Sequence, residues 1–233
     1  MRRPALAPAA SGVLAASLRY RLAVAVCLSA LTLLVMAGCS SAASTSGSAT
    51  ASPSSPTGQT YASKAFVVPL AVTLGASLKS PPNPDSRNLL SWDAADGPNN
   101  KVRFLVPVNL YRPGSVFPEA PPKDYLTYLQ ELASQGIIKL SDVTKITVDG
   151  HPATLMTETL ATDHGFDGAL GCPKADADQA EGCYGPQPEW ISRIAVIPVG
   201  NSTLLAWART SKASPNEAFL TTFETMLNSV RFR

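Results

Sequence analysis

The segment Val143-Thr-Lys-Ile-Thr-Val-Asp-Gly-His-Pro-Ala-Thr-Leu-Met-Thr-Glu-Thr-Leu160 decides the fold class of this 233-residue chain. Two extended runs, 143–148 and 153–160, flank Asp149-Gly150. Asp-Gly between two such runs is a strong hairpin signal, because glycine accepts the positive φ that tight turns require. The segment therefore predicts two antiparallel strands joined by a short turn.

Further extended segments lie on both sides of this hairpin. Residues 191–199 and 203–210 flank Gly200-Asn201 and predict a second hairpin. Upstream, FVVPLAVTL at 66–74 and VRFLVPVNLY at 102–111 are strand candidates, with a shorter one at 88–92. Each of the two longer segments contains a proline, which lacks an N–H and favours an edge strand or a bulge. The chain is therefore expected to be rich in antiparallel strands.

Two segments show helical periodicity. Residues 123–135 place four large side chains on one face, and Gly136 is expected to end that helix. Near the C-terminus, Ser214-Pro215-Asn216-Glu217 has the capping-box pattern, with Ser214 expected to accept the backbone N–H of Glu217. The apolar stripe of the second helix consists of Phe219, Leu220, Phe223, Met226 and Leu227.

These elements together predict an α+β fold, a mainly antiparallel β-sheet flanked by helices. Residues 61–233 are numerous enough for one substantial core. After Cys39, residues 40–60 are only Ser, Ala, Thr, Gly, Pro and Gln, without a charged or large apolar side chain. Such a segment cannot bury enough surface to fold. We expect this segment to be a disordered tether.

The N-terminal segment has the features of an export signal. Arg19-Tyr20-Arg21 precedes a short, largely apolar run at 22–37, and the run ends in LVMAGCSS at 34–41. This ending resembles the lipobox of bacterial lipoproteins. The resemblance implies a signal peptide over residues 1–38, cleavage between Gly38 and Cys39, and a lipid such as palmitate-containing diacylglycerol on Cys39. The alternatives are an uncleaved anchor helix and a plain secretory signal.

The charge of the exported part excludes one class of function. Four of the 19 basic residues lie before position 38 and all 17 acidic residues lie after it, which leaves a net charge of −2. The lysines and arginines are scattered along the chain rather than clustered. A domain of this charge lacks the basic patch that binds nucleic acid, and we expect nucleic acid not to be a partner.

Two cysteines remain in the expected domain, Cys172 and Cys183. An exported protein favours a structural disulfide between them, because disulfides persist outside the cytoplasm. A metal pair or a redox couple is the alternative, although redox pairs usually have two intervening residues. The acidic loop at 176–182 lacks the calcium-loop pattern, because Ala180 and Glu181 occupy its fifth and sixth places.

A search for catalytic groups finds one weak candidate. His164 lies between Asp163 and Asp167, and neighbouring carboxylates can orient a histidine as a base. A loop histidine without catalytic role is the simpler interpretation, and His151 is most simply a turn residue. Common hydrolase and phosphate-binding motifs do not occur. We therefore expect no enzyme activity, no cofactor and no metal.

Four segments resemble the secreted PsbP-like proteins of high-GC Gram-positive bacteria, including LpqN-type lipoproteins. They are FVVPLAVTL at 66–74, PPKDYLTYL at 121–129, VDGHPAT at 148–154 and MLNSVRF at 226–232. The resemblance implies an antiparallel sheet flanked by helices and a role in binding. Family members often carry a tryptophan after the first extended segment, whereas the nearest here is Trp92.

The sequence therefore favours a non-enzymatic module on the extracytoplasmic face of the cell membrane, anchored through Cys39. Its expected partner is an envelope protein or a small ligand. One alternative is an envelope hydrolase that uses His164 with Asp163 or Asp167. The other is a carrier of apolar ligands, which would require an enclosed cavity between helices and sheet.

Overall fold

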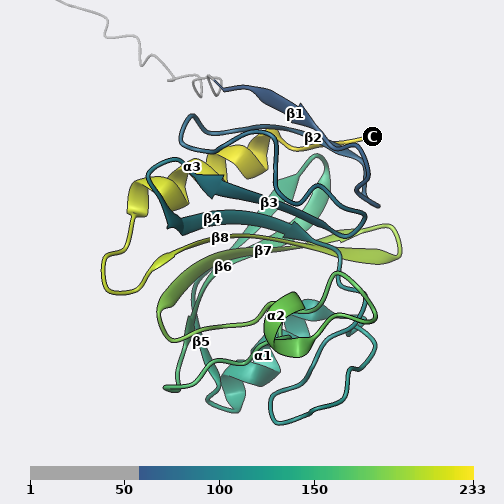
Figure 1. Cartoon of the computed structure of the whole chain (residues 1–233), viewed down its shortest axis with the longest axis vertical. Coiled ribbons are helices and arrows are strands. Elements are labelled where there is room, and N and C mark those ends of the chain that lie inside the picture. The colour runs from purple at the N-terminus through teal and green to yellow at the C-terminus, as the bar shows by residue number, and fades with distance from the viewer. Residues whose placement is uncertain (1–57) are drawn as a thin grey trace, which may run out of the picture. The chain divides into compact units, whose positions relative to one another are not determined.

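A computed structural model describes residues 58–233 (Figure 1). The fold is α+β, as the sequence predicted, with mainly antiparallel strands and few helices. The strands are β1 (Thr60–Ala62), β2 (Leu70–Thr73), β3 (Leu89–Ala94), β4 (Gly97–Leu105), β5 (Ile138–Val148), β6 (His151–Leu160), β7 (Trp190–Val199), β8 (Ser202–Ser211) and β9 (Arg231–Phe232). The helices are α1 (Tyr125–Ser134), α2 (Gln179–Gly182) and α3 (Glu217–Ser229).

The strands form two sheets. Six strands pair antiparallel in the order β3-β4-β8-β7-β6-β5, and three short strands pair in the order β1-β2-β9. Figure 1 shows α3 and the small sheet on one side of the large sheet, and α1 with α2 on the other. Because helices lie against both faces, the central strands are buried on both sides.

Alternating side chains of the large sheet enter two separate cores. On the α3 face, Trp92 and Phe104 pack with Phe223 of α3, and all three are almost fully buried. On the α1 face, Leu205 and Ile194 pack with the helix. The α1 side chains buried there are the four that the periodicity predicted, Tyr125, Tyr128, Leu129 and Leu132.

Both predicted hairpins are confirmed. Asp149 and Gly150 join β5 to β6 with φ values of 47° and 82°. Positive φ at both central residues is the type I′ arrangement, whose twist matches that of paired strands. Gly200, with φ of 58°, begins the turn between β7 and β8. His151, interpreted as a turn residue, is instead the first residue of β6, and its ring centroid lies 4.9 Å from that of Phe232.

The proline-containing segments form shorter strands than their apolar lengths suggest. β2 begins only after Pro69, whose carbonyl accepts the N–H of Arg233. β4 ends at Leu105, before Pro107, and extends upstream to Gly97.

β5 begins at Ile138, five positions before the predicted start at Val143. A bulge between Ser141 and Thr144 interrupts its alternation, which explains why the pattern was visible only after it.

The start of α3 corrects the expected capping box. Ser214 lies outside the helix, and Asn216 is the N-cap, with its Oδ1 accepting the backbone N–H of Phe219 at 3.0 Å. Asn caps as well as Ser does, so the four-residue pattern did not decide between them. The backbone N–H of Asn216 donates to Oγ1 of Thr210 at 3.1 Å, which fixes the helix start against the end of β8.

The folded part begins slightly earlier than the sequence suggested. Thr60, placed at the end of the tether, is the first residue of β1 and pairs with Thr73. The backbone carbonyl of Gln59 also accepts the N–H of Leu74. The expected signal peptide, the cleavage position at Gly38 and Cys39 lie outside the described residues. No helix among residues 58–233 is long and apolar enough to cross a membrane.

Candidate functional site

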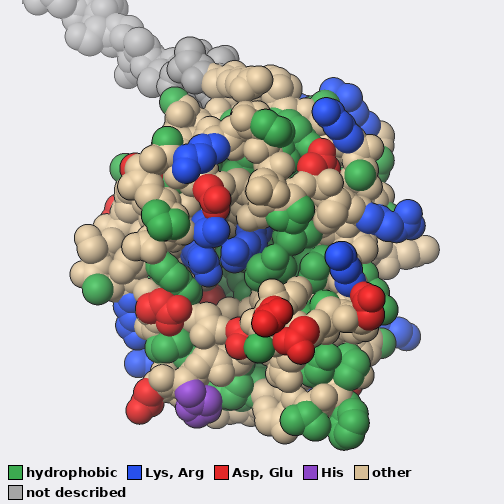
Figure 2. Space-filling view, viewed as in Figure 1, with side chains coloured by type: hydrophobic (Ala, Val, Ile, Leu, Met, Phe, Trp, Pro, Cys, Tyr) green, Lys and Arg blue, Asp and Glu red, His purple; other side chains and the backbone are tan. Residues whose placement is uncertain are grey.

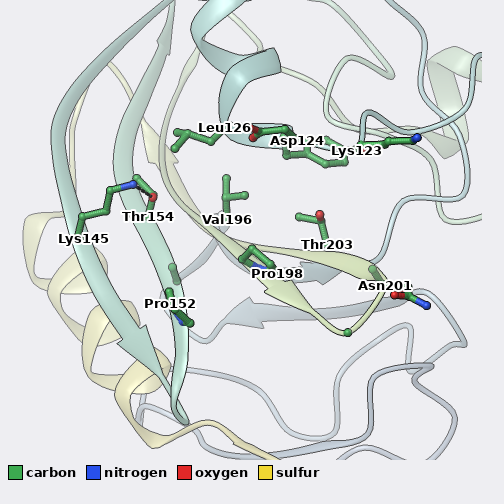
Figure 3. Close-up of a pocket in the computed structure, with 14 residues that line it drawn as sticks. Lys123, Asp124, Leu126, Lys145, Pro152, Thr154, Val196, Pro198, Asn201 and Thr203 are labelled. Carbon is green, nitrogen blue, oxygen red and sulfur yellow. Dashed lines mark hydrogen bonds between the residues drawn. The ribbon is translucent and has the colours of Figure 1, made fainter.

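A cleft of about 590 Å³, here called the α1 cleft, lies between the start of α1 and the end of the large sheet that carries the β7–β8 turn. In Figure 3, Leu126 of α1 lies on one side of the cleft, opposite Val196 and Pro198 of β7. Lys145 and Thr154 lie at one end. The volume is in the range of about 300–1,000 Å³ that is usual for small-molecule sites.

The sheet register places three of these side chains in a row. Lys145 of β5 is the cross-strand partner of Thr154 of β6, which in turn is the partner of Val196 of β7. Directly opposed residues in antiparallel strands point to the same face of the sheet. The cleft floor therefore changes from a cationic to an apolar side chain across three strands.

Asp124 begins α1 at the other wall of the cleft. Its Oδ1 accepts the backbone N–H of Thr127 at 3.0 Å, and its Oδ2 accepts the Thr127 hydroxyl at 2.8 Å. These hydrogen bonds from Thr127, the backbone one first, lower the pKa of Asp124 below its ordinary value. Among residues 58–233, Asp124 is the only one with a carboxylate that lines the cleft, and this carboxylate is thus occupied in capping the helix.

Two lysines give the cleft its charge. Lys123 and Lys145 both line it, and neither lies within 4.0 Å of a carboxylate among residues 58–233. Nζ of Lys145 donates one hydrogen bond, to Oγ1 of Thr154 at 2.9 Å. An ammonium group has three donors, so further donors of Lys145 remain for a ligand.

One residue of the cleft carries a buried polar atom that has no partner among residues 58–233. The hydroxyl of Tyr125, another lining residue, is buried and makes no hydrogen bond within the described part of the chain. Burial raises its pKa well above the ordinary value, so the group stays protonated. Buried polar groups are nearly always hydrogen-bonded, so this unpaired hydroxyl is an exception within the core under α1.

The histidine candidate lies at a second cleft, of about 470 Å³. His164 and Asp167 both line it, whereas Asp163 does not. His164 is exposed and its ring centroid lies 4.9 Å from that of Phe166. Oδ1 of Asp167 accepts a hydrogen bond from Nε2 of Gln187 at 2.6 Å, and burial raises the pKa of this carboxyl. The structure thus brings one of the two carboxylates to the cleft of His164 without a hydrogen bond between them.

The predicted disulfide between Cys172 and Cys183 is present, with the two Cα atoms 4.2 Å apart. It closes the acidic loop, in which Oδ1 of Asp178 accepts the backbone N–H groups of Ala180 and Glu181. Among residues 58–233, no group of three or more His, Cys, Asp or Glu side chains could hold a metal ion.

The sequence did not reveal the α1 cleft. Its walls come from α1, β5, β6 and the β7–β8 turn, which lie far apart along the chain. The one available signal was the hairpin itself, because the Asp149-Gly150 turn fixes the register that sets Lys145 opposite Thr154.

No family model matches the chain, and no curated protein matches its sequence. Among solved structures, the chain is similar to the solution structure of cyanobacterial PsbP (CyanoP) from Synechocystis sp. PCC 6803. The identity is 10%, with 75% of this chain and 92% of that chain covered and a TM-score of 0.41. It is also similar to a Pseudomonas aeruginosa protein of unknown function, at 17% identity, with 67% and 85% covered and a TM-score of 0.32. A PsbP protein is thus a structural neighbour, and likeness of this degree carries no conclusion about what this chain does.

Proposed function

We propose that this chain is a lipid-anchored module on the extracytoplasmic face of the membrane that binds an anionic amphiphile in the α1 cleft. The observation that carries the proposal is the composition of that cleft. Apolar side chains of Leu126, Val196 and Pro198 face one another, and Lys145 lies at one end of the cleft, while Lys123 lines it with its side chain extending outward. An apolar wall with a few convergent polar groups is the usual design of a small-molecule site.

The charge of the cleft selects the anionic ligand. Both lysines lack an ion-pair partner among the described residues, and Asp124 is engaged by Thr127. A carboxylate or phosphate head beside Lys145 would gain a charge-assisted hydrogen bond. The cleft is open to solvent rather than enclosed, which favours a binding module over a carrier that hides its whole ligand.

Binding of decanoate, with decanol as the uncharged comparison, tests this proposal. The assay uses residues 40–233 without the lipid anchor, and calorimetry measures both affinities. We expect decanoate to bind more tightly than decanol, and Lys145→Gln to weaken decanoate roughly tenfold, as expected for loss of one charge-assisted hydrogen bond. Decanol binding should be unchanged in that variant.

Lys139→Gln is the matched control, because Lys139 lies on the same strand, is exposed and does not line the cleft. It should bind both ligands as the unmodified protein does. Leu126→Glu should abolish binding of both, since it places a charge on the apolar wall. Equal binding of decanoate and decanol, or equal losses in the two lysine variants, would contradict the proposal.

The anchor is tested separately. Cys39→Ala should leave the precursor without lipid and move the protein from the detergent phase to the aqueous phase in Triton partitioning. Unchanged partitioning of the variant would contradict the lipoprotein assignment without bearing on the cleft.

A second candidate function, hydrolysis of envelope material, is favoured by one observation. His164 and Asp167 line the same cleft, as a histidine oriented by a carboxylate requires. Turnover of short-chain p-nitrophenyl esters that is lost in both His164→Ala and Asp167→Asn would support it. Turnover that survives His164→Ala would exclude this mechanism.

A further inference from the structure

Two arginines lie side by side on the large sheet, away from the α1 cleft. Arg103 of β4 is the cross-strand partner of Trp207 of β8, and Arg209 of β8 is the partner of Lys101. Arg103 and Arg209 are therefore diagonal neighbours on one face of the sheet. Figure 2 shows lysine and arginine side chains gathered in a hollow over this region of β4 and β8.

An aromatic ring lies close to each of the two guanidinium groups. Cζ of Arg103 lies 4.5 Å from the ring centroid of Tyr184, and Cζ of Arg209 lies 4.3 Å from that of Trp190. Stacking on the flat face of a guanidinium leaves its N–H donors in the plane, available to an acceptor at the edge. Tyr184 is itself held in place, because it follows Cys183 of the disulfide and its backbone pairs with Gly171.

Neither guanidinium has a partner within the described part of the chain. No carboxylate lies within 4.0 Å of either one, and Nε of each is buried without a hydrogen bond. Arg193, on the opposite face of the same sheet, shows the usual alternative, since its Nε contacts Oε1 of Glu224 at 2.8 Å. Burial first, and then repulsion by Arg103, lowers the pKa of Arg209 to about 10, so Arg209 remains charged at neutral pH.

Three acidic side chains lie near this pair, and none contacts it. Asp93 and Glu189 act on Arg209 from a distance, and Asp93 is itself paired with Lys101 at 2.8 Å. Asp167 lines the same pocket as the two arginines, but its Oδ1 accepts from Gln187. An arginine in contact would lower the pKa of that carboxyl, whereas burial raises it. Two like charges that share a half-buried pocket without an anion in contact are unfavourable, and a bound anion would reduce that cost.

We propose that Arg103 and Arg209 form a binding site for the phosphoryl group of a phosphate monoester. The pocket they line has a volume of about 160 Å³, enough for one phosphoryl group and too small for a whole drug-sized ligand. Two planar guanidinium forks match the charge of nearly −2 and the three terminal oxygens of such a group. The site is separate from the α1 cleft, with which it shares no lining residue.

Calorimetric titration of the full-length chain in a non-ionic detergent, at constant ionic strength, tests the site. Inorganic phosphate should bind saturably and more tightly than acetate. Arg103→Gln and Arg209→Gln should each weaken phosphate binding roughly tenfold to a hundredfold, as expected for lost hydrogen bonds to a charged group. Arg103→Lys keeps the positive charge but lacks the planar pair of N–H donors of a guanidinium group. Its affinity for phosphate should lie between those of Arg103→Gln and the unmodified protein, which also guards against a folding defect as the cause of the loss.

Arg112→Gln is the matched control. Cζ of Arg112 lies 5.2 Å from the ring centroid of Tyr128, a comparable stacking arrangement, but its Nε is paired with Glu119 at 2.9 Å. This variant should bind phosphate normally. Absence of saturable phosphate binding, equal binding of acetate, or the same loss in Arg112→Gln and Arg103→Gln would overturn the proposal.

The source of the phosphoryl group follows from a second titration, with a short-chain phosphatidic acid. Tighter binding than that of inorganic phosphate, lost in Arg209→Gln, identifies a lipid headgroup as the ligand. Equal affinities identify a free phosphate or a small soluble monoester. Phosphatidic acid binding that persists in Arg209→Gln while phosphate binding is lost would assign the lipid to the α1 cleft, and only the phosphate to this site.

Discussion

Replacing Glu158 by glutamine should stabilise the domain at pH 8 and change its stability little at pH 5. Glu158 of β6 is 2% exposed, and its Oε1 is buried without a partner among the described residues. Burial, opposed in part by a hydrogen bond with the Ser192 side chain, raises the pKa of this carboxyl from 4.5 to about 7. The carboxyl is therefore largely protonated at pH 5 and largely ionised at pH 8.

The sign and size of the effect follow from the two pKa values. Because the folded state holds its proton at a higher pH than the unfolded state, ionisation favours unfolding. The contribution of Glu158 to stability is greatest below the unfolded pKa, decreases as pH rises from about 4.5 to 7, and is constant above that. A pKa difference of about 2.5 units corresponds to roughly 3 kcal/mol. Glutamine is a neutral analogue of the protonated acid and removes this decrease.

Urea unfolding of the unmodified protein and Glu158→Gln at pH 5 and pH 8 measures the effect. The difference in unfolding free energy between the two proteins should grow by roughly 2.5 kcal/mol in favour of the variant between pH 5 and pH 8, because a small part of the effect has already developed at pH 5. Glu181→Gln, which removes an exposed carboxylate, should show no comparable change between the two pH values. A difference that is the same at both pH values for Glu158→Gln would refute the reasoning.

Three further predictions concern stability, measured by urea melts at pH 7. Phe223→Ala should cost about 3–5 kcal/mol, because its side chain is 1% exposed in the core under α3, and a cost below 1 kcal/mol would contradict that packing. Asn216→Ala should cost about 1 kcal/mol by removing the N-cap, while Ser214→Ala should have almost no effect. A larger loss of stability in Ser214→Ala than in Asn216→Ala would instead support the capping box expected from the sequence. Replacing both Cys172 and Cys183 by serine should lower the unfolding free energy by roughly 3 kcal/mol, because the disulfide restricts the unfolded chain. The same unfolding free energy with and without the disulfide would contradict this reasoning.

The parts of the fold that were predictable are those specified by neighbouring residues. Asp149-Gly150 specifies its own turn, and the spacing of Tyr125, Leu129 and Leu132 specifies a helix face. The start of α3 was predicted two positions too early, because Ser214 and Asn216 are equally good caps. The contact between Asn216 and Thr210 decides between them, and that contact exists only once β8 is folded.

The candidate sites were not predictable for a related reason. Arg103 and Arg209 are ordinary strand residues in the sequence and become neighbours only through the pairing of β4 with β8. The α1 cleft likewise depends on the packing of α1 over β6 and β7. The disulfide was predictable because Cys172 and Cys183 were the two cysteines left in the expected domain. The lipid on Cys39 stays a prediction.

The central claim, an anionic amphiphile in the α1 cleft, is tested most directly by amide chemical shifts during a titration of residues 40–233 with decanoate. The account predicts that the largest saturable shifts occur at Leu126, Thr154 and Val196, which line the cleft from α1, β6 and β7. Shifts confined to the surroundings of His164 or Arg103, with these three amides unchanged, would contradict it.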